Sequence, residues 1–333
     1  MMIRMHMNES PYDFPFRAKV RMLFRALITP WNRYPEAMTE KALEALSSFT
    51  GKKKENLLLG NGSNELIRLS FLTWGGAGKK IVWASPTFVT YEKEARRSGC
   101  CPLAVPLDED LDFDFGTFSE AAEKADMVVL ISPGNPSGKQ LAIKKIEEIV
   151  KHCPGMVIVD EAYGEFAGQT AMDLIEKYRN LIILRTFSKA FGLAGGRIGY
   201  AVGSQRIIED LKKASLPYNP GIFPLLLLQE AIKEKRVPGK RVKKICNERA
   251  RLLVSLKKMP FVDVCPGEGN FFLMRGKSRE ANTVIFNVLQ EKKILPRVYR
   301  EEGAIVRLRI TVGRPWENRR FLKAMETVQR RLS

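Results

Sequence analysis

The sequence predicts an α/β protein built around a parallel β-sheet. Short apolar runs alternate with longer amphipathic segments up to residue 189. Strands buried on both faces of a parallel sheet read as continuous apolar runs, and the connecting helices read as amphipathic segments. No repeat of fixed period occurs, which argues against a solenoid. The runs predicted as strands are 57–59, 80–83, 127–131, 156–159 and 181–184.

Each predicted strand ends in a loop of turn-forming, polar or ionisable residues. Turn geometry alone can account for the Gly, Pro, Asn and Ser in these loops. It does not require the carboxylate of Asp160 or the amine of Lys189. Because ligands of open α/β sheets bind outside the carboxyl ends of the strands, we expect one site where the loops meet. The loops are 60–64, 85–88, 132–136, 160–163 and 185–189.

The chain changes character beyond Pro224. Residues 233–258 contain eleven basic and two acidic residues, and from Pro238 onward they predict a long amphipathic helix with a basic outer face. Segments 270–274 and 305–312 predict strands, and 321–332 predicts a closing helix. We therefore expect a smaller second domain after the sheet.

Composition narrows the class of protein. A chain of 333 residues that is 45% hydrophobic and 28% charged is neither disordered nor fibrous. Its net charge of +18 favours an anionic partner, either nucleic acid or small phosphates. The five cysteines form no C-x-x-C pair, and no signal peptide or apolar run long enough to span a membrane is visible. We expect a cytoplasmic protein.

Several catalytic classes are disfavoured by residues the sequence lacks. Only His6 and His152 are present, and neither follows a predicted strand, so a histidine metal site or a Ser-His-Asp triad is not expected. Residues 75–80 do not match a P-loop, and the glycines of 192–199 lack the dinucleotide-binding spacing. We expect no metal site and no nucleotide triphosphatase.

The remaining candidates match the needs of pyridoxal 5′-phosphate. Lys189 can form a Schiff base with its aldehyde, and Asp160 can keep its pyridine nitrogen protonated, so that the ring accepts electrons. Tyr163 and Asn135 can donate hydrogen bonds to the ring oxygen, and Phe88 offers a face for stacking. The sequence predicts Lys189, Asp160 and Tyr163 as the catalytic residues.

Other residues suit the cofactor's phosphate. Ser63 and Asn64 begin a predicted helix, where free amides and the helix dipole favour an anion. Ser188 and Arg197 are expected to close around the same group.

The chain resembles fold-type I pyridoxal-phosphate-dependent aminotransferases, most closely the histidinol-phosphate aminotransferases. The motifs that carry this resemblance run through nearly the whole chain in the family's order. Taken singly some are weak, but the ordered set is specific. They lie at 8–11, 33–35, 60–65, 86–88, 132–138, 159–163, 185–191 and 309–313.

The resemblance implies an architecture and a division of the chain. It implies a large domain with a mostly parallel seven-stranded sheet between helices, and a smaller α+β domain. With the change of character after Pro224, the boundaries expected are an N-terminal arm at 1–30 that joins the small domain, a large cofactor-binding domain at 31–222 and a small domain at 223–333.

The resemblance also implies a reaction and an assembly. The reaction is amino transfer between glutamate and imidazole-acetol phosphate, in histidine biosynthesis. The implied homodimer shares its active sites, with Tyr34 reaching the partner subunit's cofactor phosphate and contributing to the substrate site. Arg309 is expected to hold the substrate carboxylate, which a planar guanidinium matches bidentately. Arg297 aligns with the family's arginine for the substrate phosphate.

Three departures and three alternatives remain open. Asn64 stands where Asp is common, Phe88 replaces a frequent Tyr, and the short arm leaves the imidazole contacts unassigned. Threonine-phosphate decarboxylase or an aromatic amino-acid aminotransferase would use the same lysine and aspartate. A nucleic-acid-binding protein would account for the charge, although no recognition module is visible.

Overall fold

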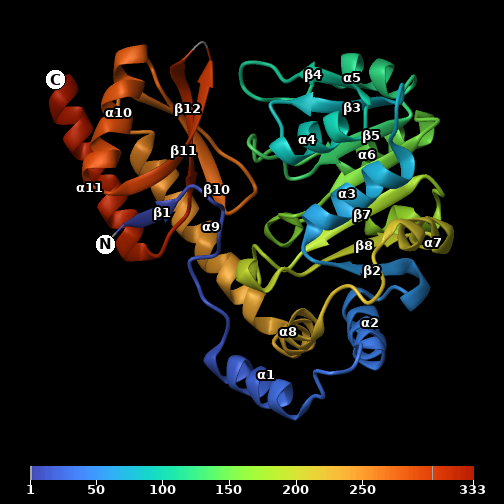
Figure 1. The fold of residues 1–333 in the computed structure, drawn as a ribbon. Helices are drawn as coiled ribbons and strands as arrows, with labels where there is room; N and C mark the ends of the chain where they lie inside the picture. Colours follow the sequence, from blue (N-terminus) through green and yellow to red (C-terminus); the bar gives the residue numbers. More distant parts are fainter. Residues whose placement is uncertain (1, 302) are drawn as a thin grey trace.

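The computed structural model describes residues 2–301 and 303–333, with two β-sheets (Figure 1). The larger sheet has seven strands in the order β2-β8-β7-β6-β5-β3-β4, and only β8 runs antiparallel to its neighbours. The predicted mostly parallel seven-stranded sheet is confirmed. Its strands are β2 (Leu57–Gly60), β3 (Lys80–Ser85), β4 (Cys101–Pro106), β5 (Met127–Ile131), β6 (Met156–Asp160), β7 (Leu181–Thr186) and β8 (Gly199–Gly203).

Alternate residues of the central strands enter two different cores. In β6, Val157 and Val159 belong to one hydrophobic cluster, whereas Ile158 belongs to the other. Because successive side chains of a strand point to opposite faces, the all-apolar runs require helices on both sides. The helices around this sheet are α2 (Glu36–Thr50), α3 (Ser63–Trp74), α4 (Val89–Arg97), α5 (Phe115–Ala122), α6 (Ile143–His152) and α7 (Gln205–Ala214).

The smaller sheet combines both ends of the chain. Its order is β1-β11-β12-β10-β9, and β1 (Ile3–Met5) pairs in parallel with β11 (Ile294–Glu301). Figure 1 shows this N-terminal strand, in blue, among the orange and red strands. The other elements of this part are β9 (Val262–Cys265), β10 (Phe271–Gly276), β12 (Ala304–Thr311), α9 (Arg236–Leu256), α10 (Arg279–Glu291) and α11 (Pro315–Leu332).

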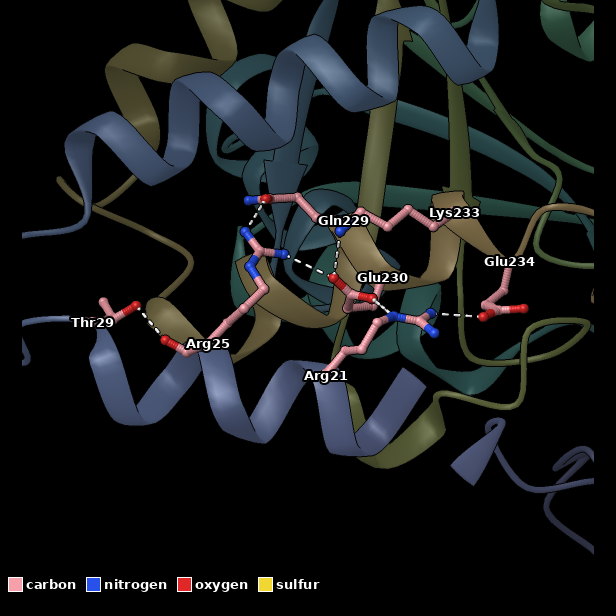
Figure 2. Close-up of polar contacts among 7 residues, drawn as sticks. All are labelled: Arg21, Arg25, Thr29, Gln229, Glu230, Lys233 and Glu234. Carbon is pink, nitrogen blue, oxygen red and sulfur yellow. Dashed lines mark hydrogen bonds and ion pairs between the residues drawn. The ribbon is translucent and has the colours of Figure 1, made fainter. Parts of the chain in front are cut away.

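Helix α1 (Phe16–Ile28) packs on α8 (Ile222–Lys233) rather than on either sheet. Figure 2 shows the polar contacts between them, which centre on the fully buried carboxylate of Glu230. Arg21 and Arg25 of α1 and Lys233 of α8 donate to it at 2.7, 3.0 and 2.7 Å. Three cations compensate one buried charge, so the contact fixes where α1 lies on α8.

Short 3₁₀ turns occupy several loops. None of the described helices is long and apolar enough to cross a bilayer. The basic helix predicted from Pro238 is α9, which begins two residues earlier, at Arg236. The domain boundaries proposed at 30 and 222 stay a prediction. The 3₁₀ turns are η1 (Lys54–Asn56), η2 (Gly164–Phe166), η3 (Met172–Glu176) and η4 (Ala194–Gly196).

Candidate active site

A cleft of about 570 Å³ opens at the carboxyl edge of the seven-stranded sheet. Loops after β2, β3, β5, β6 and β7 all contribute to its wall, together with the N-terminal arm, β11 and β12. The structure therefore brings the predicted loops to one place. The predicted site residues that line this cleft are Ser63, Asn64, Phe88, Asn135, Asp160, Tyr163, Ser188, Lys189, Arg197, Arg297 and Arg309.

Lys189 holds its amine inside this cleft. Its Nζ donates to the carbonyl oxygen of Met7 at 3.3 Å and lies 5.7 Å from the centre of the Tyr163 ring. None of the described ion pairs includes Lys189. Desolvation, helped by the positive charges of Arg309 and Arg197, lowers the pKa of this amine to about 8. The uncharged share of Lys189 near neutral pH is therefore far larger than that of an ordinary lysine, and this form can act as a nucleophile or base.

Asp160 ends β6 with its carboxylate buried, at 3% exposure. The Tyr91 hydroxyl donates to its Oδ2 at 2.8 Å, and the Ala162 amide donates to its Oδ1 at 2.9 Å. Burial raises the pKa of Asp160, while these two hydrogen bonds lower it. A carboxylate fixed in this way faces the same cleft as Lys189 and suits a cationic partner.

Tyr163 meets the N-terminal arm in this cleft. Its hydroxyl oxygen accepts a hydrogen bond from Asn8 Nδ2 at 2.8 Å, and burial raises the pKa of Tyr163 to about 12. The phenol therefore stays protonated and keeps its own hydrogen to donate. The backbone of Asn8 is left-handed, with φ of 50°, and its backbone N–H donates to the Thr311 hydroxyl at 2.9 Å. The arm thus orients a catalytic candidate.

Part of the cleft wall has the features of a phosphate site. The first turn of α3, at Ser63, lies against the Arg197 guanidinium across Gly62. A Cβ on Gly62 would come within 2.6 Å of Arg197 Nη2, and the backbone there has φ of +82°, so both space and conformation require glycine. Free helix amides beside a guanidinium favour a dianion. Ser188, 7% exposed, accepts a hydrogen bond from Thr186 at 3.0 Å in the same cleft.

Two further arginines line the cleft. Arg309 of β12 is 7% exposed, and it pairs across the ladder with Arg297 of β11. Its guanidinium donates to the His6 carbonyl at 2.9 Å, to the Tyr299 hydroxyl at 3.4 Å and to the side-chain oxygen of Asn135. Its Nε has no hydrogen-bond partner among the described residues. A buried cation without a carboxylate partner calls for a bound anion.

Tyr34 does not line the cleft of its own chain. Its side chain is 76% exposed, and its ring stacks on Tyr218 with 4.2 Å between ring centres. The prediction that it serves a partner subunit stays a prediction.

Sequence reasoning missed several residues of the site. His6, Asn8 and Tyr299 line the cleft, and Tyr91 contacts Asp160. The motif at 8–11 gave a signal for the arm but no role, and Tyr91 had only its helical spacing from Phe88. Among the described residues, no group of His, Cys, Asp and Glu is arranged to hold a metal ion.

Comparisons with known proteins show the family of this chain. The family model for aminotransferase class I and II matches residues 1–325. Histidinol-phosphate aminotransferase of Thermococcus kodakarensis is 38% identical over 96% of this chain and 90% of its own length. The enzyme of the same name from Chlorobaculum tepidum is 34% identical over 97% of this chain and 93% of its own.

Solved structures show the same fold. Histidinol-phosphate aminotransferase from Sinorhizobium meliloti, in complex with pyridoxal-5′-phosphate, superposes with a TM-score of 0.91 at 21% identity, covering 100% of this chain and 92% of that one. L-threonine-O-3-phosphate decarboxylase from Porphyromonas gingivalis gives 0.84 at 22% identity, with 98% and 99% covered. The family match and the conserved architecture together show that the chain belongs to the class I and II aminotransferases, which use pyridoxal 5′-phosphate.

Proposed function

We propose that this enzyme transfers an amino group between glutamate and imidazole-acetol phosphate, which yields histidinol phosphate. One observation carries the proposal: a single cleft is lined by a reactive amine and by groups that suit two anions. Lys189, Arg197 with the start of α3, and Arg309 with its ladder partner Arg297 all line it. The curated relatives named above carry this activity in their names.

The residues present fit pyridoxal 5′-phosphate. Ser63, Asn64, Ser188 and Arg197 would hold its phosphate, because they supply amides, hydroxyls and a guanidinium at a helix N-terminus. The remaining contacts would come from Asp160 to the ring nitrogen, Tyr163 and Asn135 to the ring oxygen, and Phe88 to the ring face. When bound, the cofactor supplies an aldehyde and a ring that accepts electrons.

Lys189 provides both the attachment point and the proton transfer. Because its pKa is lowered to about 8, its Nζ can release and take back a proton near neutral pH. Because this pKa lies near the working pH, the same amine can remove a proton from the substrate carbon in one step and return a proton in a later step. The hydrogen bonds from Tyr91 and Ala162 stabilise the charged form of Asp160, which would hold the ring nitrogen, and Tyr163 stays protonated to donate.

Two arginines would recognise the substrates. Arg309 offers its unpartnered Nε and a rigid fork, which suit a carboxylate such as that of glutamate. Arg297, its neighbour across the ladder, would bind the phosphate of the acceptor.

A coupled assay tests this function. With glutamate as donor, imidazole-acetol phosphate is expected to give the fastest formation of 2-oxoglutarate, ahead of aromatic keto acids. Release of CO₂ from threonine phosphate, with no 2-oxoglutarate from any acceptor, would contradict it. Binding of duplex DNA at physiological salt by a preparation that captures no cofactor would favour the nucleic-acid alternative.

The proposal includes a homodimer in a reducing compartment, the cytoplasm. All five cysteines are free thiols.

The face of α1 turned away from α8 is apolar and exposed, with Phe16 at 79% and Leu27 at 77%, and Tyr34 follows it in the chain. An exposed apolar helix face of this kind is typical of a subunit interface. It is where a second copy would place Tyr34 near its neighbour's cleft.

Complementation tests whether Tyr34 acts across this interface. Tyr34→Ala is expected to lower kcat/KM about tenfold, through the lost hydrogen bond to a charged phosphate. When Tyr34→Ala and Lys189→Ala chains are co-expressed with different affinity tags and purified as a mixed dimer, activity should exceed that of either parent. One of the two sites then has both residues intact. A mixed dimer no more active than Tyr34→Ala would contradict the shared site.

A further inference from the structure

Tyr91 is a buried tyrosine whose hydroxyl points at a single carboxylate. It lies in the first turns of α4, is fully buried, and donates to Asp160 Oδ2 at 2.8 Å. It is not among the residues that line the cleft, whereas Asp160 is, so it contacts Asp160 from outside the space for a cofactor.

Packing fixes the direction of this hydroxyl. The Tyr91 ring lies 6.3 Å from the Phe88 ring at 77° and 6.4 Å from the Phe71 ring at 45°. Aromatic neighbours on two sides restrict its ring to one orientation. The hydroxyl therefore reaches the carboxylate without having to be ordered first.

The surroundings of Asp160 shift its pKa in both directions. Burial has the largest effect and raises the pKa of Asp160, and the negative charge of Glu161 adds to that effect. The Tyr91 hydroxyl, the Ala162 amide and the charge of Lys189 act in the other direction. Tyr163 also feels the charge of Asp160. Burial keeps the pKa of Tyr91 well above its ordinary value, so Tyr91 is a permanent neutral donor.

We propose that Tyr91 is a positioning residue for the reaction, because its hydroxyl fixes the Asp160 carboxylate and stabilises its charge toward the cofactor's ring nitrogen. This inference rests on the proposed role of Asp160. It assigns to Tyr91 part of the electron-accepting power of the ring, because an ionised Asp160 is what keeps the ring nitrogen protonated. Phe88 and Tyr91, on one turn of chain, would then control the face and the nitrogen of the same ring.

The test compares two tyrosine hydroxyls that each donate to a carboxylate. Tyr91→Phe removes the one on Asp160, whereas Tyr178→Phe removes the one that donates to Glu147 at 3.1 Å, outside the cleft. Tyr91→Phe is expected to weaken pyridoxal-phosphate affinity about tenfold, the scale of a hydrogen bond to a charged group. Tyr178→Phe should leave that affinity unchanged.

A second readout is spectroscopic. Without the Tyr91 hydroxyl, the ring nitrogen should hold its proton less firmly, which makes the ring less positive. The visible band of the Lys189-bound cofactor should then change at a pH about one unit higher, because a nearby positive charge normally lowers the pKa of the nitrogen that joins Lys189 to the cofactor. A Tyr91→Phe variant that had merely lost packing would melt at a lower temperature, but the pH at which the visible band changes would stay the same.

Asp160→Asn separates failure of this inference from failure of the proposed function. In that background, Tyr91→Phe should have little further effect on cofactor affinity, because the two residues act as one unit. If Asp160→Asn weakens affinity while Tyr91→Phe behaves like Tyr178→Phe, or adds its full effect to Asp160→Asn, the role of Tyr91 is overturned and the proposed function stands. If Asp160→Asn leaves affinity unchanged, the proposed function itself fails.

Discussion

Lys189→Ala is expected to abolish amino transfer, lowering kcat by at least about 10⁴-fold, since one substitution removes both the attachment point and the proton-transfer group. Lys189 is the one lysine among the described residues that line the cleft, so no second amine there is placed to replace it. The measurements are kcat in the coupled assay and the visible absorption band after addition of pyridoxal phosphate.

Two control variants make this result specific. Lys189→Arg keeps the positive charge but cannot form the linkage, so it should be as inactive as Lys189→Ala. Lys177→Ala removes a surface lysine that pairs with Glu147 and should have wild-type activity. Wild-type absorption by Lys189→Ala would show that another amine captures the cofactor.

The lowered pKa of Lys189 gives the same prediction a pH dependence. Only the uncharged amine attacks an aldehyde, and its share grows as pH rises toward the pKa of about 8. Cofactor capture by the apoenzyme should therefore accelerate with rising pH and level off above 8. An ordinary lysine would still be gaining uncharged amine two pH units higher.

Arg309→Lys is expected to reduce kcat/KM for glutamate by roughly 100-fold, within the range for losing a partner of a buried, hydrogen-bonded charge pair. The substitution keeps the charge but loses the planar fork, and it leaves the Tyr299, His6 and Asn135 contacts incomplete. Single-turnover kinetics with glutamate, read from the cofactor band, measure this half of the reaction directly.

A matched arginine outside the cleft provides the control. Arg275 of β10 is half-exposed and pairs with Asp263 at 3.5 Å, so Arg275→Lys should change kcat/KM little. The effect of Arg309→Lys should appear mainly in KM, because recognition of the anion precedes chemistry. Equal losses for an amine donor with and without a carboxylate would contradict the proposed contact.

Much of the large sheet could be predicted from the sequence because its central strands are buried on both faces. The runs at β5, β6 and β7 are short, continuous apolar stretches, which is the pattern that predicts fully buried strands. Two other strands gave weaker signals. β4 lies at the sheet edge with mostly exposed side chains, and β8 is short and bounded by glycines.

The site divides in the same way. Asp160 ends one strand, and Lys189 and Asn135 follow two others that run in the same direction, so strand order brings all three to one edge of the sheet. Asn8 and Tyr91 arrive by other routes, the first through pairing of β1 with β11 and the second through the packing of α4. No pattern in the local sequence encodes those contacts, because they depend on tertiary placement.

Pairing of β1 with β11 also determines when the enzyme becomes functional during its synthesis. Asn8 reaches Thr311 across 303 residues, so a ribosome must translate almost the entire message before the arm has anything to dock on. Until then the half-made polypeptide exposes an incomplete pocket and an unpaired strand, the state in which a chaperone is most useful. A nascent chain stalled before β12 should therefore not turn over substrate, however well its large sheet has already folded.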